Sequence, residues 1–167
     1  NDPKIKKLLE EVKDREFIGY SYDGADASFE LLARRLMGDI PRYISINEYD
    51  VSVKKDSTGE VISFAKAKLE VDGHEILCEG EGNGPVNALD NAIRKNVNKL
   101  EKYSEYLKDL KLVDYKVRIL NTGTGAVTRV SIESADSKHG NWFTIGVSPN
   151  IIDCLLYTSD AADEKYR

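Results

Sequence analysis

The residues best suited to chemistry lie between Gly80 and Lys95, where glycines at every second position lead into Pro85 and an amphipathic segment. Glycine lets a backbone bend sharply or approach a neighbour closely, and proline fits the first position of a helix. The spacing predicts a bend and then a helix whose first amide groups can meet a negative group. Two interpretations fit this stretch: a strand-to-helix corner, or a carboxylate site built from backbone N–H groups. It matches neither the dinucleotide-binding GxGxxG pattern nor the P-loop.

The other reactive residue types form no recognisable constellation. Cys78, Cys154, His74 and His139 have neither the spacing of a disulfide framework nor that of a metal site. No Ser/His/Asp arrangement, no paired carboxylates and no cysteine beside a histidine can be assembled. The sequence therefore predicts no catalytic residue, no metal ligand and no cofactor in this chain, and the cysteine usage favours a reducing cytoplasm.

Length and charge limit the classes of partner. The 167 residues, 41% of them hydrophobic, suffice for one ordinary domain with a short appendage. A net charge of −5 with scattered basic residues argues against nucleic acid and membrane surfaces as partners. No apolar run approaches the roughly 18 residues of a spanning helix. The chain begins Asn1-Asp2 without an initiator Met, so we expect a piece of a longer protein.

Two helices are predicted ahead of everything else, and residues 1–40 are expected to form a helical linker subdomain. The first covers about residues 4–15, where apolar positions recur at helical spacing in a charged setting. The second begins near Asp26, whose side chain can cap it, and ends at Gly38 and Pro41. Its apolar face is predicted from Phe29, Leu32, Ala33 and Leu36.

The rest of the chain, residues 41–167, contains the same pattern of predicted elements twice. Three strands (44–53, 61–71, 75–80) precede a helix from Pro85 to about residue 102, and three more (114–120, 126–134, 142–147) precede a helix opened by Pro149. Tyr49-Asp50-Val51 corresponds to Tyr115-Lys116-Val117 (115 − 49 = 66). The predicted fold is α+β: two pseudo-twofold-related βββα units, about 43–102 and 112–167, each an antiparallel sheet covered by a helix. Edge strands in such small units favour a homodimer.

Three blocks carry a resemblance to a known family. Residues 80–90, GEGNGPVNALD, residues 114–120, DYKVRIL, and residues 145–152, IGVSPNII, resemble the C-terminal regulatory (allosteric, dimerisation) domain of the 2-isopropylmalate synthase and citramalate synthase family. Residues 4–37 resemble that family's linker. The second block and the linker are more similar to citramalate synthase than to leucine-regulated 2-isopropylmalate synthase. The resemblance implies a dimeric domain that binds the pathway's end-product amino acid and inhibits an attached enzyme, which in citramalate synthase condenses acetyl-CoA with pyruvate and responds to isoleucine.

The resemblance also implies an effector pocket and an absent catalytic barrel that holds a divalent metal. The implied pocket residues are Gly82, Gly84, Val86 and Asn87 from the bend, with Leu112, Tyr115, Ile119, Ala126 and Val147 from the second unit. Isoleucine and leucine both remain open as effectors, because the apolar residues do not separate isomeric side chains. A leucine-responsive isopropylmalate synthase and a ligand-free dimerisation module are the alternatives. Residues 154–167 depart from the family pattern, which predicts an incomplete second covering helix and a weakened domain.

Overall fold

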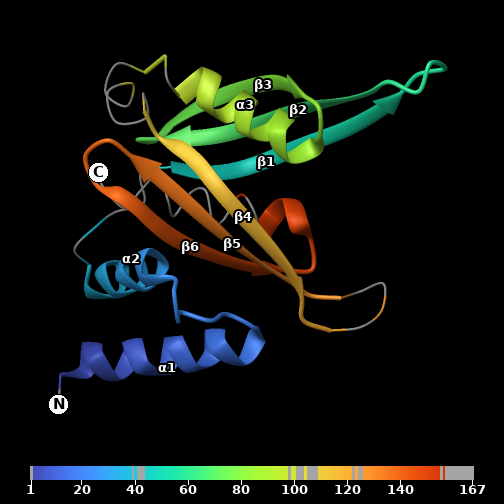
Figure 1. The fold of residues 1–167 in the computed structure, drawn as a ribbon. Coiled ribbons are helices and arrows are strands. Elements are labelled where there is room, and N and C mark those ends of the chain that lie inside the picture. The colour runs from blue at the N-terminus through green and yellow to red at the C-terminus, as the bar shows by residue number, and fades with distance from the viewer. Residues whose placement is uncertain are drawn as a thin grey trace. The chain divides into compact units, whose positions relative to one another are not determined.

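The computed structural model describes residues 2–38, 40, 44–97, 99–100, 104, 109–121, 123, 126–154 and 156. Within these ranges the chain forms two three-stranded antiparallel sheets and helices, which confirms the predicted α+β class (Figure 1). Contacts divide it into two compact units: unit 1 combines residues 1–42 with 110–167, and unit 2 is residues 43–109. The elements in chain order are α1 (Pro3–Ile18), α2 (Asp26–Met37), β1 (Ile44–Lys55), β2 (Val61–Val71), β3 (His74–Gly82), α3 (Pro85–Val97), β4 (Lys111–Ile119), β5 (Thr128–Asp136) and β6 (Gly140–Ser148).

Unit 2 is a meander of β1, β2 and β3 with α3 packed on one face (Figure 1). The predicted Asp72-Gly73 hairpin is confirmed, and both residues have positive φ, 50° and 78°, as a tight two-residue turn requires. The buried face of β2 consists of alternate residues from Ser63 to Val71. It packs against Ala88, Leu89, Ala92 and Val97 of α3.

The contact between α3 and β3 is unusually close because the facing residues are small. A Cβ atom added at Gly80 would lie 2.5 Å from Ala92 N and 2.8 Å from Ala88 O. One added at Gly82 would lie 2.5 Å from Ala88 N. These two glycines therefore serve close packing of backbone on backbone, and they belong to strand β3. The prediction that the bend begins at Gly80 is wrong, since the chain leaves the sheet only after Gly82.

In unit 1, β4, β5 and β6 form the second meander. Val130 and Ile132 of β5 are fully buried on one face, and Cys154 lies against the same region, its Sγ donating to Thr128 O at 3.2 Å. Residues 151–154 are helical, in agreement with the predicted helix after Pro149. Residues 155 and 157–167, which include most of the segment predicted to be aberrant, lie outside the described part of the chain.

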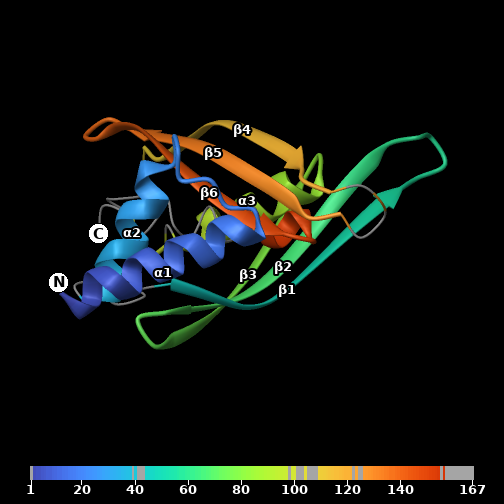
Figure 2. The same ribbon diagram turned by 90° about the horizontal axis from the view of Figure 1, so that it is seen from below.

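The N-terminal helices belong to unit 1. Figure 1 and Figure 2 show α1 on the side of α2 away from the sheet, and α2 contacts β6. No described residue of α1 is buried, which confirms a surface helix. Helix α2 ends at Gly38 as predicted, with φ 79°. The Asp26 cap is wrong, because Asp26 is the first helical residue and Ala25 precedes it without a side-chain cap.

The buried face of α2 is also offset from the prediction. Phe29 is exposed, and the buried residues are Ala27, Leu31 and Leu32. Contacts with β6 fix the position of α2. Ser28 Oγ accepts a hydrogen bond from Ile145 N at 2.9 Å, and Ala27 packs with Trp142. The linker helices thus share a core with the second sheet, and the prediction of a separate subdomain over residues 1–40 stays untested.

The predicted repeat appears in the strand register. A bulge interrupts β1 at Asn47 and β4 at Val113, 66 residues apart (113 − 47 = 66). Across the first sheet, Val51, Ala65 and Gly80 are partners, and across the second, Val117, Val130 and Gly146 are partners. Because the same set of paired positions recurs with the bulge at the same place, the two sheets have the same register.

Candidate functional site

The candidate bend consists of Asn83 and Gly84 between the end of β3 and the start of α3. The first backbone hydrogen bond of the helix runs from Ala88 N to Gly84 O at 2.9 Å. The amides of Val86 and Asn87 come before that bond, so helix geometry gives them no carbonyl partner inside the helix. The first turn of α3 carries no acidic side chain. The positive end of its dipole is therefore not offset locally, which favours a negative group there.

Space is open above the bend. A Cβ atom added at Gly84 would meet no protein atom within 4 Å, and the residue does not have the positive φ seen at the turn glycines. Among the glycines with open space in the described chain, Gly84 alone has this ordinary backbone conformation. Its lack of a side chain is thus required neither by packing nor by φ, and it leaves room for a small ligand next to the amides.

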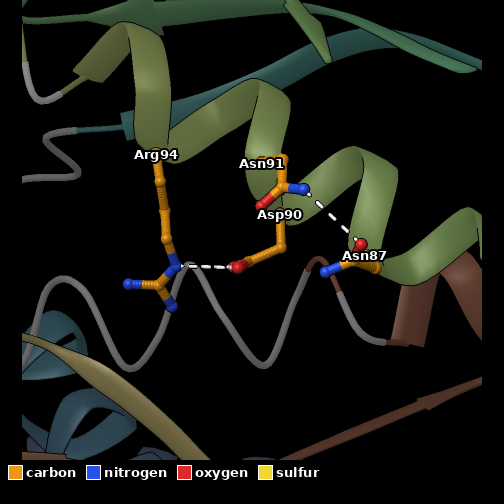
Figure 3. A network of polar contacts seen from close by, with 4 residues as sticks. All are labelled: Asn87, Asp90, Asn91 and Arg94. Atoms are coloured by element: carbon orange, nitrogen blue, oxygen red, sulfur yellow. Dashed lines mark hydrogen bonds and ion pairs between the residues drawn. The ribbon is translucent and has the colours of Figure 1, made fainter. Parts of the chain in front are cut away.

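Polar contacts join the bend to the helix, and Figure 3 shows those among Asn87, Asp90, Asn91 and Arg94 of α3. Asn87 Oδ1 accepts a hydrogen bond from Asn83 N at 3.3 Å. Asn91 Nδ2 donates to Glu81 O at 2.9 Å and approaches Asn87 Oδ1 at 3.5 Å. One turn further along, Arg94 Nε forms an ion pair with Asp90 Oδ1 at 2.8 Å. Gly82, Gly84, Val86 and Asn87 lie at the end of β3, in the bend and in the first turn of α3, all in unit 2.

The predicted residues of β4 form an exposed row in unit 1. Leu112, Tyr115 and Ile119 pair with Ser134, Ile132 and Thr128, so all three lie on the sheet face that buries Val130 and Ile132. Tyr115 is 47% exposed and Ile119 69% exposed. An edge strand with a bare apolar row is available to a ligand or to another chain.

The remaining two predicted residues lie elsewhere in unit 1. Val147 pairs with Arg129, which puts its side chain on the face opposite Tyr115 and Ile119. There it lies under Gly19, at which an added Cβ would be 3.4 Å from Val147 Cγ1. Ala126 is half-buried just before β5. The structure thus brings Leu112, Tyr115 and Ile119 onto one face of the sheet and does not bring Val147 to that face.

The structure also has hollows away from the predicted residues. One of about 760 Å³ adjoins α3 and is lined by Lys66, Glu79, Arg94 and Asn91 among others. Another, of about 780 Å³, lies among α1, α2 and the tyrosines Tyr20 and Tyr22. Their walls contain charges of both signs, such as the Lys66–Glu79 pair at 3.0 Å. The first lining includes Gly80 and Glu81 of the predicted bend, and neither lining includes Asn83 or Gly84.

The described part of the chain offers neither a metal cluster nor a membrane-spanning helix. Over the described ranges, no cluster of three or more His, Cys, Asp or Glu side chains could hold a metal ion. Within the same ranges, no helix is long and apolar enough to cross a membrane.

Sequence comparison identifies the class of protein that this fold represents. The sequence model of the LeuA allosteric (dimerisation) domain matches residues 23–155, and the chain belongs to that family. The particular relatives are synthases. The chain is 44% identical over 155 residues to an (R)-citramalate synthase of Geobacter sulfurreducens, covering 91% of this chain and 29% of the relative. It is 43% identical over 154 residues to an (R)-citramalate synthase of Aquifex aeolicus, covering 90% and 28%.

A relative from the neighbouring branch matches a shorter stretch. The chain is 38% identical over 88 residues to a 2-isopropylmalate synthase of Clostridium acetobutylicum, covering 52% of this chain and 14% of the relative. The chain thus spans under a third of the length of the citramalate synthases that it matches. The predicted family is confirmed, with citramalate synthases giving the longer matches.

Sequence reasoning missed two features of the site. The helical spacing of Val86, Leu89, Ile93, Val97 and Leu100 predicts an apolar stripe with Asn91 facing water, yet the Asn91 side chain connects helix and bend. That stripe omits Ala88 and Ala92, which are fully buried against β3. Two small residues one helical turn apart, preceded by glycines at alternate strand positions, are a signal of close packing that could have been recognised.

Proposed function

We propose that this chain is the regulatory part of a citramalate synthase, in which it binds isoleucine and mediates feedback inhibition. Membership of an allosteric and dimerisation domain family, with citramalate synthases as the longer matches, supports the proposal. The parent reaction would be the condensation of acetyl-CoA with pyruvate in a catalytic barrel outside this chain, which would carry the divalent metal. The proposed partners are that barrel and a second copy of the chain, and the proposed compartment is the cytoplasm.

One observation carries the binding proposal: the Asn83-Gly84 bend combines open space with first-turn amides that have no carbonyl partner inside the helix. Backbone amides at a helix start receive a carboxylate without help from a cationic side chain. Every amino acid effector offers that carboxylate, and the protein surface at Gly84 is unobstructed. The bend is therefore the proposed site of the effector's carboxylate.

The mechanism proposed for inhibition is a shift of population. An effector that binds one arrangement of the chain more tightly than another biases the equilibrium between them. The segment from Gly19 to Gly24 between α1 and α2 is the proposed hinge, since both of its end residues are glycines with positive φ. A leucine-responsive isopropylmalate synthase is the second candidate, supported by the Clostridium acetobutylicum relative.

Calorimetric titration with L-isoleucine, and separately with L-leucine, tests the proposal. Saturable binding of isoleucine at least about tenfold tighter than leucine, a difference of about 1.4 kcal/mol, is expected. The reverse preference would assign the chain to isopropylmalate synthase. No binding of either, with a dimer seen in a sizing measurement, would leave a ligand-free dimerisation module.

Gly84→Leu locates the binding site. The added side chain fills the space above the bend without meeting a protein atom at its Cβ position, so binding is expected to weaken at least about tenfold while the unfolding curve is retained. Gly84→Ala is the matched control, because a single methyl group occupies little of that space. Equal effector affinity in wild type and Gly84→Leu would remove the bend from the site.

A further inference from the structure

Helix α1 is held by contacts at its two ends rather than by burial of its side chains. None of its 16 residues is buried, so apolar burial contributes little to its position. At its start, the exposed Lys4 Nζ donates to Met37 O at the end of α2, at 3.0 Å. At its end, Arg129 Nε of β5 donates to Gly19 O at 2.5 Å. Both donors are charged and only Arg129 is partly shielded from water, so the bond to Gly19 is the stronger of the two.

Three strands of the second sheet contribute to the surface on which Gly19 lies. Arg129 belongs to β5, and its strand partner in β6 is Val147. A Cβ atom added at Gly19 would lie 3.4 Å from Val147 Cγ1 and would force the side chain of Leu120, the residue after β4, to move. Gly19 also has a φ of 120°, which residues with a side chain rarely adopt. The lack of a side chain therefore lets the end of α1 lie directly on the sheet.

The charges around Arg129 favour the same contact. The last carbonyl groups of a helix carry partial negative charge, which attracts a cation. Arg129 also lies directly opposite Arg118 of β4, on the same face of the sheet, and like charges in that arrangement repel each other. The Arg129 guanidinium is therefore drawn toward the Gly19 carbonyl and away from Arg118.

We propose that Arg129 is a latch: it fixes the end of α1 to the second sheet and transmits a rearrangement of the sheet to α1. This inference rests on the proposed function, in which the segment from Gly19 to Gly24 is the hinge, and it identifies the contact that must open before the hinge can move. Leu120, Arg129 and Val147 come from the ends of three strands, so a shift of any one strand changes the surface under Gly19. Arg129 acts through Gly19 and is thus a positioning residue.

Amide hydrogen exchange of the chain without ligand, followed by NMR, tests the latch. Arg129→Met keeps most of the apolar stem and removes the charged donor. The Gly19 and Tyr20 amides donate to carbonyls in the last turn of α1, and their exchange is expected to accelerate about tenfold, as for the loss of one hydrogen bond from a charged group. Exchange at the Ile145 amide, which bonds to α2 instead, is expected to stay unchanged.

Arg118→Met is the matched control, because it removes the neighbouring guanidinium from the same face of the sheet. Exchange at the Gly19, Tyr20 and Ile145 amides is expected to stay within about twofold of wild type in this variant. Unchanged exchange at Gly19 and Tyr20 in Arg129→Met would overturn the latch. So would an equal acceleration in Arg118→Met, or an acceleration that extends to Ile145 and therefore reports a general loss of structure.

A second measurement tests transmission, using whichever of L-isoleucine and L-leucine wild type binds. Saturation is expected to change exchange at the Gly19 and Tyr20 amides at least about fivefold, the lower end of ordinary coupling between sites. That response is expected to disappear in Arg129→Met and to persist in Arg118→Met. No response in a wild type that binds the amino acid would overturn the inference and leave the proposed function intact. Failure of wild type to bind either amino acid would overturn the proposed function and the transmission with it, while exchange in the unliganded chain would still decide whether the latch exists.

Discussion

The two sheets of this chain share one register and differ in what surrounds them. Each has a bulge at the same place in its first strand, at Asn47 and at Val113. The connection from the third strand to the helix has two residues in both units, Asn83 and Gly84 in unit 2 and Pro149 and Asn150 in unit 1. The first helical hydrogen bonds correspond as well, from Ala88 N to Gly84 O and from Cys154 N to Asn150 O. The copies therefore differ here in residue type, because Gly84 stands where the other unit has Asn150, whose side chain accepts a hydrogen bond from Ile152 N.

The second difference concerns the outer face of each sheet. This is the face opposite to the one on which alternate residues of β2, or of β5, are buried. In unit 1, Ile145 on the outer face is 5% exposed beside α2. In unit 2, the corresponding region of β3 carries Leu77, which is 70% exposed, and Glu79, which pairs with Lys66. The outer face of the second sheet is therefore covered at Ile145 by its own unit, whereas the outer face of the first sheet carries an ion-paired surface.

The largest loss of stability is expected from shortening a buried side chain on the outer face of the second sheet. Ile145→Ala removes a nearly buried side chain next to α2 and is expected to cost about 3 kcal/mol of unfolding free energy. Leu77→Ala, on the exposed outer face of unit 2, is the control and is expected to cost less than about 0.5 kcal/mol. Urea unfolding curves measure both. Similar losses in the two variants would show that the outer face of unit 2 is covered in solution.

The next effect concerns the seam between α3 and β3. Gly80→Ala places a methyl group against the Ala92 and Ala88 backbone and is expected to destabilise the chain by about 2 kcal/mol. The control is Gly84→Ala, whose methyl group meets no atom within 4 Å, and its stability is expected to stay close to that of wild type. If thermal unfolding showed Gly80→Ala to be as stable as wild type, the helix would not pack directly on the strand.

The smallest effect distinguishes the hairpins that join the second and third strands. In unit 1, Asp136 accepts hydrogen bonds from Lys138 N at 2.9 Å and from His139 N at 2.5 Å. Desolvation acts to raise the pKa of Asp136, but the hydrogen bonds from His139 and Lys138 outweigh it and leave that pKa below its ordinary value. The folded state therefore gains stability from Asp136 above the ordinary carboxyl pKa and loses it as the pH falls through the lowered value.

Asp136→Ala is accordingly expected to cost about 1 kcal/mol at pH 7 and less near pH 3. The corresponding turn of unit 2 supplies the control, Asp72→Asn, because asparagine tolerates the φ of 50° found there. Urea titrations at the two pH values give the comparison, and a loss for Asp136→Ala that did not depend on pH would exclude the carboxylate as its source.

Periodicity predicted the elements well because strands with one buried face alternate visibly, as in β2, and because Asp72-Gly73 and Gly38 mark their turn and cap. It failed at Gly80 and Gly82, since glycine was interpreted as a source of bending when the decisive property was its lack of a Cβ next to Ala88 and Ala92. The prediction that Asp26 caps α2 was wrong for a related reason. The residue type suits a cap, but α2 begins at Asp26 itself, next to Ala27, which packs against Trp142. The predicted bend residues cluster in the structure, whereas the face on which Val147 lies depends on strand register, which residue types alone did not reveal.

The chain contains two cysteines, one in each unit, and both are buried: Cys78 in β3 and Cys154 beside Thr128. Burial raises the pKa of both thiols, so each is a poor nucleophile until its surroundings open. Alkylation followed by peptide mass spectrometry would therefore time the opening of each half of the molecule separately. Equal labelling rates would mean that the halves melt as one cooperative body, and unequal rates would show which half yields first.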